Sequence, residues 1–130
     1  NLSGVTDVRL INNNTMSKDS YGNPAKSVHL YVIGGADADI IQTYFDYLPP
    51  QSNTIGSVMG TATDIGGRQH IVAFDRAETV PIFIKVDIHV DDTKFDTDNG
   101  PASIKTNIVN YFDTLGMGDK VLYSKLFAPA

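Results

Sequence analysis

Two stretches of the chain alternate apolar and polar residues, which is the pattern of a half-buried β-strand. In the first, residues 27–33, the apolar side chains Val28, Leu30 and Val32 share one face. In the second, residues 82–90, every even-numbered position is Ile or Val, and this is the most regular alternation in the chain. We therefore predict a strand at each stretch.

Two other segments carry apolar residues at helical spacing, which predicts amphipathic helices. The first stripe consists of Ile40, Ile41, Tyr44, Phe45 and Leu48. The second consists of Ile104, Ile108, Tyr111, Phe112 and Leu115. We expect Asp37 to be the N-cap of the first helix, because its carboxylate can accept a free N–H, and Pro49-Pro50 to end it. Pro101 stands at the expected first position of the second helix, and Gly116 just past its end.

Shorter strands complete the predicted elements. Residues 4–11 form a strand that leads into a loop rich in Asn, Ser, Asp, Gly and Pro. Residues 54–63 and 68–75 form two strands joined at residues 64–68, whose Gly-Gly pair is typical of a hairpin turn. Residues 120–127 close the chain as a strand or a frayed end.

The order of these elements predicts an α+β fold with two small subdomains. Residues 1–79 read as ββαββ, and residues 80–130 as an incomplete βαβ, with Pro81 near the seam. The second part resembles half of a split-βαβ or ferredoxin-like unit that lacks its completing strands. We therefore expect its amides to exchange faster than those of residues 27–75.

Composition narrows the class of protein. The chain has 130 residues, a net charge of −5 and no cysteine. An acidic chain lacks the basic surface that binds nucleic acid or an anionic membrane, and no apolar run approaches a membrane span. The first residue is not Met, and no signal-peptide pattern follows it. Together with the abrupt end LFAPA, this indicates a piece of a longer protein or a processed chain.

The glycine pair after the strand at residues 27–33 is a candidate phosphate loop. A dinucleotide fingerprint needs a third glycine, which is absent after Gly34-Gly35, and no G-K-[ST] follows. Asp37 and Asp39 occupy the helix start where an anion would bind and would repel it. We therefore expect a turn here and no nucleotide cofactor.

The acidic loop before the second helix is a candidate calcium site. Its carboxylates come from Asp87, Asp91, Asp92, Asp96 and Asp98. Counted back from Gly100, however, the EF-hand register requires an oxygen ligand where Phe95 stands. We expect a solvated loop in which Asp98 or Asn99 caps the helix, with a weak Ca²⁺ site as the alternative.

Other catalytic or metal-binding patterns lack specificity. His29, His70 and His89 lie on three separate predicted strands, without the close pairing of a zinc motif. Ser57 lies beside a glycine but not in a G-x-S-x-G elbow. We expect no catalytic residue, no metal and no cofactor, and hence not an enzyme.

Several motifs occur in an order that is informative as a whole. A Gly-Val strand, an Asn-Thr turn and a D-x-x-G-x-P loop come first. The strand that ends in Gly34-Gly35 follows, then acidic residues that open a helix, a proline, and a T-x-G turn that ends at Gly56. A Phe-x-Arg sequence then precedes a long strand.

In this order and spacing the motifs resemble the C-terminal part of the baseplate J-like family, the wedge subunits of contractile phage tails. The resemblance covers nearly the whole chain. Ala77 stands where the family commonly has proline after Phe-x-Arg, a departure that affects a turn.

The resemblance implies a structural virion protein of a phage, prophage or phage-like machine, made in the host cytoplasm and located in the tail baseplate. Its partners would be other baseplate and tail proteins and a second copy of the chain, with no nucleic acid or membrane. Candidate contact residues are Ile33, Phe83, Leu126 and Phe127. The alternative is a small ligand- or Ca²⁺-binding domain that uses the Gly34-Gly35 turn or the loop from Asp91 to Asp98.

Overall fold

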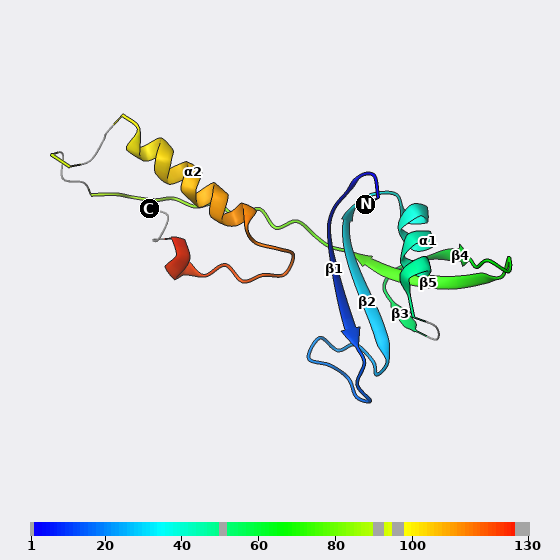
Figure 1. The fold of residues 1–130 in the computed structure, drawn as a ribbon. Coiled ribbons are helices and arrows are strands. Elements are labelled where there is room, and N and C mark those ends of the chain that lie inside the picture. The colour runs from blue at the N-terminus through cyan, green and yellow to red at the C-terminus, as the bar shows by residue number, and fades with distance from the viewer. Residues whose placement is uncertain (1, 50–51, 90–92, 95–97, 127–130) are drawn as a thin grey trace. The chain divides into compact units, whose positions relative to one another are not determined.

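A computed structural model describes residues 2–49, 52–89, 93–94 and 98–126. The chain forms two compact units, residues 1–79 (unit 1) and residues 80–130 (unit 2). Each is described by itself below. Figure 1 shows their helices and strands.

Unit 1 is a mixed sheet with one helix. Its elements are β1 (Val5–Asn13), β2 (Ser27–Gly34), α1 (Asp37–Tyr47), β3 (Asn53–Ile55), β4 (Val58–Thr63) and β5 (Gln69–Arg76). The five-stranded sheet has the order β1-β2-β5-β4, and β3 also pairs with β2. The β1–β2 and β4–β5 pairs are antiparallel, whereas β2 runs parallel to both β3 and β5. The fold is therefore a small α+β fold, as the pattern predicted.

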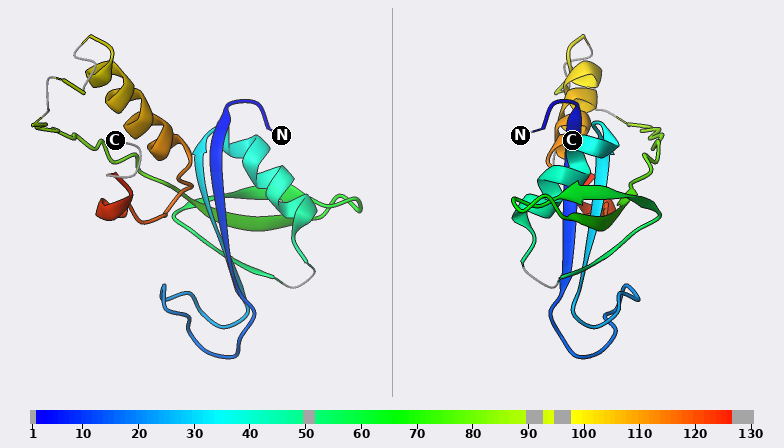
Figure 2. Two further views of the ribbon diagram at one scale, coloured as in Figure 1. Left: turned by 60° about the vertical axis from the view of Figure 1, so that its left-hand side comes forward. Right: turned by 90° about the vertical axis from the view of Figure 1, so that its right-hand side faces the viewer.

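The core of unit 1 lies between α1 and one face of the sheet, an arrangement visible in both views of Figure 2. The predicted apolar row on β2 is buried there, and β4 and β5 contribute Ala62, Val72 and Phe74. From the predicted stripe of α1, Ile40, Ile41 and Tyr44 are buried. The predictions of this helix and of the β2 alternation are confirmed.

The sequence predicts one strand at residues 54–63, but the structure has two there, β3 and β4. The run breaks at Gly56-Ser57 because its halves pair with different neighbours: β3 with β2, and β4 with β5. The predicted hairpin turn at residues 64–68 is confirmed, since the N–H of Asp64 donates to the carbonyl of Arg68 at 2.9 Å.

The described part of unit 2 contains α2 (Gly100–Asp113) and a short 3₁₀ helix, η1 (Tyr123–Leu126). The strand predicted at residues 82–90 is wrong as far as the structure describes it, and of the two alternatives for residues 120–127 the strand is not found in the described part. Residues 82–89 belong to no strand, and 123–126 are helical. Val90 and Phe127 lie outside the described residues. A strand is stabilised by a paired neighbour, and the described residues of unit 2 provide none.

The helix ends differ from prediction at two points. Ala36, not Asp37, is the N-cap of α1, and Asp37 is its first residue, so the chain turns one residue earlier than predicted. In unit 2, Pro101 does lie in the first turn of α2, behind Asn99 at the N-cap. The helix ends at Asp113, and it is Gly118, not Gly116, that has a positive φ.

Candidate functional site

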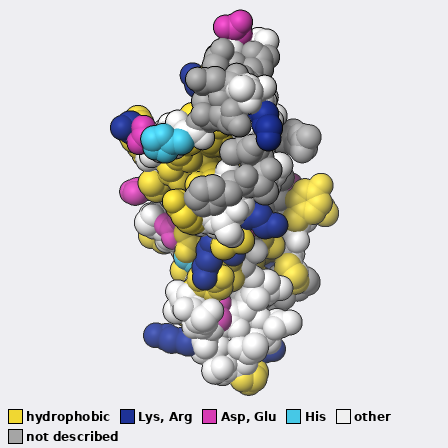
Figure 3. Space-filling model, turned by 90° about the vertical axis from the view of Figure 1, so that its left-hand side faces the viewer, with side chains coloured by type: hydrophobic (Ala, Val, Ile, Leu, Met, Phe, Trp, Pro, Cys, Tyr) yellow, Lys and Arg dark blue, Asp and Glu magenta, His cyan; other side chains and the backbone are white. Residues whose placement is uncertain are grey.

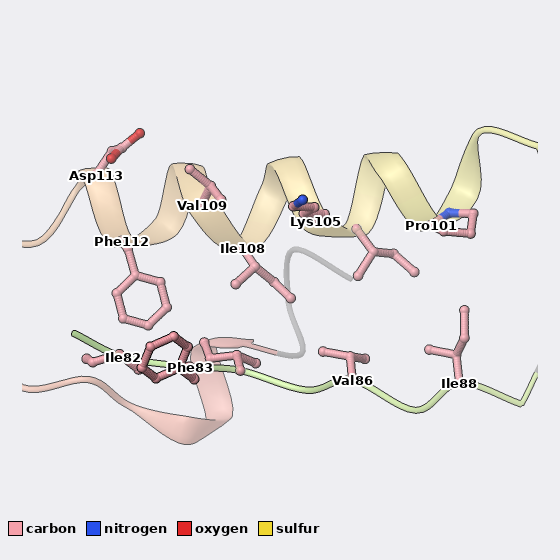
Figure 4. A pocket seen from close by; sticks show the side chains of 12 residues that line it. Ile82, Phe83, Val86, Ile88, Pro101, Lys105, Ile108, Val109, Phe112 and Asp113 are labelled. Atoms are coloured by element: carbon pink, nitrogen blue, oxygen red, sulfur yellow. The ribbon is translucent and has the colours of Figure 1, made fainter.

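An apolar groove in unit 2 lies between α2 and the segment before the acidic loop. It has a volume of about 710 Å³. We call it the unit 2 groove, and its apolar lining residues are Ile82, Phe83, Ile84, Val86, Ile88, Pro101, Ile104, Ile108, Val109 and Phe112. Figure 4 shows Ile108 and Phe112 projecting from α2 toward the extended segment, and Val86 and Ile88 projecting back toward the helix.

Shielding in the unit 2 groove is incomplete on both walls. Val86 remains 47% exposed and Ile88 43%, and no residue of α2 is buried. Phe83 also lines the groove but is 92% exposed. Figure 3 shows hydrophobic side chains, in yellow, gathered on one face of the molecule. Apolar side chains in two facing rows gain stability when further apolar surface covers them, so the groove is suited to binding protein.

A second open apolar face lies in unit 1, beside α1. Val8 and Leu10 of β1 are opposite Val32 and Leu30 of β2 and therefore point to the same side of the sheet as the core. They remain about half exposed. Because β1 is an edge strand, this face could be extended by another chain.

A cluster of polar side chains ties the loop after β1 to the sheet. The Asn23 amide donates to the Asp19 carboxylate at 2.9 Å, and its oxygen lies 2.7 Å from His29 Nδ1. His29 Nε2 lies 2.6 Å from Asp75 Oδ2. The hydroxyl and N–H of Ser57 both donate to Asp75 Oδ1, at 2.6 and 2.7 Å. These contacts join the loop, β2, the β3–β4 turn and β5.

The cluster contains serine, histidine and aspartate, but not in the order of a catalytic triad. In a triad the histidine lies between the serine and the acid, where it can accept the hydroxyl proton. Here Asp75 lies between Ser57 and His29. Both ring nitrogens of His29 already have protein partners, so neither is open to a metal. The arrangement is suited to holding the loop in place.

Hydrogen bonding also sets the ionisation of the two carboxylates. The pKa of Asp75 lies below its ordinary value, chiefly because the Ser57 hydroxyl donates a hydrogen bond to the carboxylate. Burial opposes this lowering, whereas the Ser57 N–H and His29 lower the pKa further. The pKa of Asp19 is lowered as well. Burial acts against this shift, but the hydrogen bonds from Asn23, Tyr21 and Gly22 outweigh it. These hydrogen bonds therefore favour the ionised form of both Asp19 and Asp75.

The Gly34-Gly35 turn is closed by a side chain from another strand. Both glycines have φ of +78°, and a Cβ on Gly34 would lie 2.1 Å from the carbonyl oxygen of Gly4. The Arg76 guanidinium donates to the carbonyls of Gly34 and Gly35 and pairs with Asp37. The Arg76 guanidinium at this helix start is thus already bonded to protein oxygens. The positive φ and the close approach of Gly4 explain why positions 34 and 35 are glycine.

The remaining candidate ligands are not brought together. His70 lies 2.9 Å from Asp64 and stacks on Phe45, and it shares no partner with His29. His89 is exposed in unit 2. Within the part of the chain that the structure describes, no three His, Asp or Glu side chains could hold a metal ion. Of the acidic loop, Asp91, Asp92 and Asp96 lie outside that part.

Sequence reasoning missed the residues that hold unit 1 together by polar contacts. Asn13 is buried and donates to the carbonyls of Ser17, Asn23 and Pro24. Asp75 and Arg76 also make such contacts, with His29 and with the Gly34 and Gly35 carbonyls. The available signal was the D-x-x-G-x-P loop and the Phe-x-Arg sequence, because those motifs contain Asp19, Asn23, Asp75 and Arg76.

Comparison with known proteins adds no relative, since no protein-family model and no curated protein matches the chain. Neither helix in the described ranges is long and apolar enough to cross a membrane.

Proposed function

We propose that the chain is an assembly module of a tail baseplate wedge, in a phage, a prophage or a phage-like contractile machine. Its partners would be neighbouring baseplate and tail proteins. The observation that carries this proposal is the unit 2 groove, where an amphipathic helix and an alternating segment face each other without forming a closed core. The motif order that resembles baseplate J-like proteins supplies the identity of the assembly.

The polar cluster supports the same role in a second way. The motifs that resemble the family are the ones that brace unit 1: Asp19 and Asn23 in the loop, and Asp75 and Arg76 at the end of β5. An assembly module that contacts its neighbours through fixed surfaces needs its loops held to its sheet, and these contacts hold the loop after β1 and the end of β5 in place.

The proposal is tested by the composition of tail particles. Contractile tails purified from the source bacterium should contain the chain in constant ratio to the sheath protein, as measured by quantitative mass spectrometry. The chain should also be found at the baseplate end by antibody labelling and electron microscopy. Recovery of the chain only in fractions free of tails would contradict the proposal.

A substitution in the unit 2 groove connects the structure to this assay. Ile108→Glu places a charge on the wall that faces the extended segment, and we expect it to abolish incorporation into particles. Asn110→Glu changes the charge equally on an exposed position of the same helix and serves as the matched control. Equal incorporation of both variants would mean that the groove makes no contact in the assembly.

A further inference from the structure

The segment at residues 82–89 has the properties of a strand that awaits a partner. Its even-numbered residues line the groove and are partly shielded, whereas Lys85 and Asp87 do not line it and are strongly exposed. This two-residue period is that of a strand with one covered face. Yet among the described residues no backbone ladder pairs with it. Such a segment is a template for strand addition.

The charges on the exposed face restrict what can pair with it. Lys85 Nζ lies 3.3 Å from Asp87 Oδ1, so one positive and one negative group stand two residues apart on the same face. In an antiparallel pair, residues directly opposite point to the same face and interact. A partner strand is therefore favoured if it places an acid opposite Lys85 and a base opposite Asp87.

A second copy of the same segment meets this requirement in one register. If Val86 lies opposite Val86, then Lys85 lies opposite Asp87 in both directions, and Ile84 lies opposite Ile88. If Lys85 lies on the axis instead, two lysines meet, and like charges directly opposite destabilise the pair. A shift by a single residue would put the apolar row opposite the polar row.

We propose that two copies of the chain associate through residues 84–88, as an antiparallel pair of strands with Val86 on the two-fold axis. The pairing joins the apolar rows of the two copies beneath the α2 helices and arranges four charges with alternating sign. The interface is self-complementary, as a two-fold interface must be. This inference names a partner for the unit 2 groove and therefore rests on the proposed assembly function.

Cysteine cross-linking tests the register in the full chain. The protein has no cysteine, so Val86→Cys provides a single thiol per copy. Opposite residues in an antiparallel pair have Cα atoms about 4.5–5.5 Å apart, within the range that a disulfide spans. Under mild copper–phenanthroline oxidation this variant should form a covalent dimer. Ile84→Cys alone should not, but it should cross-link when mixed with Ile88→Cys.

Charge exchange tests the same register without a covalent bond. Lys85→Asp and Asp87→Lys should each weaken the dimer on the order of tenfold, measured by sedimentation velocity, because each places like charges opposite one another. When mixed, the two variants should form a heterodimer, since every pair is then complementary. The double variant, with both changes in one chain, should dimerise like the unchanged protein.

The opposite results would overturn the inference. One such result is that the unchanged chain stays a monomer at every soluble concentration. Another is that Val86→Cys and Ile84→Cys cross-link equally well, and a third is that the charge variants dimerise as strongly as the unchanged chain. In each case two copies of the chain do not pair through this segment in the proposed register. Failure here is distinct from failure of the proposed function, which is decided by whether purified tails contain the chain.

Discussion

Replacing Gly56 with alanine should destabilise unit 1 much more than the same replacement at Gly60. A Cβ at Gly56 would lie 2.1 Å from both the carbonyl carbon and the oxygen of Phe74, and 2.4 Å from its Cα. Carbon atoms in contact are about 3.5–4.0 Å apart, so the overlap exceeds 1 Å by a rough comparison. Phe74 is fully buried in the core, and its backbone cannot move without displacing β5.

Gly60 provides the matched comparison, because it is also close to the core. A Cβ there would lie 2.3 Å from Cδ1 of Ile41, the far end of a flexible side chain. Turning the Ile41 side chain about 30° off its rotamer costs about 0.5–1.5 kcal/mol, and alanine regains roughly 0.5–1 kcal/mol by restricting the unfolded chain. The net loss at Gly60 should therefore be about 1 kcal/mol or less.

At Gly56 no such relief exists. Overpacking costs typically 1–3 kcal/mol, and a clash with backbone lies at the upper end, about 3 kcal/mol. The same gain from alanine as at Gly60 leaves a net loss of about 2–2.5 kcal/mol. For a unit of 79 residues, 1 kcal/mol corresponds to a shift of about 4–8 °C in Tm. We therefore expect Gly56→Ala to lower the Tm of unit 1 by roughly 8–20 °C, and Gly60→Ala by less than about 8 °C.

The measurement is thermal unfolding followed through the NMR amide signals of Val72 and Phe74. Both residues are in β5, so the readout reports unit 1 without a contribution from unit 2. If Gly56→Ala melts at or above the temperature of Gly60→Ala, the close approach at Phe74 is wrong and so is the reasoning from it.

Four further predictions follow from the same structure. The lowered pKa of Asp75 contributes stability that is present above its unfolded value of about 4 and is lost as the pH falls through the folded pKa. Asp75→Asn should therefore reduce the difference between the urea unfolding midpoints at pH 7 and pH 3. An unchanged difference would argue against the polar cluster. Burial raises the pKa of Tyr44 to about 12, so absorbance titration should show a late-titrating tyrosine that is missing in Tyr44→Phe. Because the Tyr44 hydroxyl donates to the Val28 carbonyl, that variant should also lose about 1 kcal/mol of stability. Arg76→Lys should lower the stability of unit 1 by about 1–2 kcal/mol and speed amide exchange near Gly34-Gly35, because one ammonium group cannot make the several hydrogen bonds of a planar guanidinium. As a control, Lys85→Arg should leave the stability of unit 1 unchanged. Finally, the amides of residues 80–126 should exchange faster than those of residues 27–75, and equal protection would show that unit 2 is as stable as the sheet.

Local pattern was sufficient for the elements that are stabilised within one segment or by its immediate neighbours. Both helices follow from apolar residues three and four positions apart, because a helix forms its hydrogen bonds internally. The β4–β5 hairpin follows from its Gly-Gly turn, which brings adjacent segments together. The alternation on β2 correctly identified the face that is buried against α1.

What depends on distant residues could not be predicted in this way. The most regular alternation in the chain, at residues 82–89, is not a strand in the structure, because a strand needs a partner and alternation does not provide one. The break at Gly56-Ser57 arises because the two halves of the run pair with different strands. The acid at the start of α1 is bonded by Arg76, which is 39 residues away in sequence.

The same distinction between local pattern and distant contacts applies to the candidate sites. The residue types alone made His29 a possible ligand and Gly34-Gly35 a possible phosphate turn, since composition and spacing describe what a side chain can do. Only the tertiary structure places Asn23 and Asp75 on the two nitrogens of His29, and the Arg76 guanidinium on the glycine carbonyls. The sequence by itself therefore determined the local elements, the acidic charge and the apolar faces. The tertiary structure decided which of those faces are covered, because burial and pairing are made between segments that are far apart along the chain.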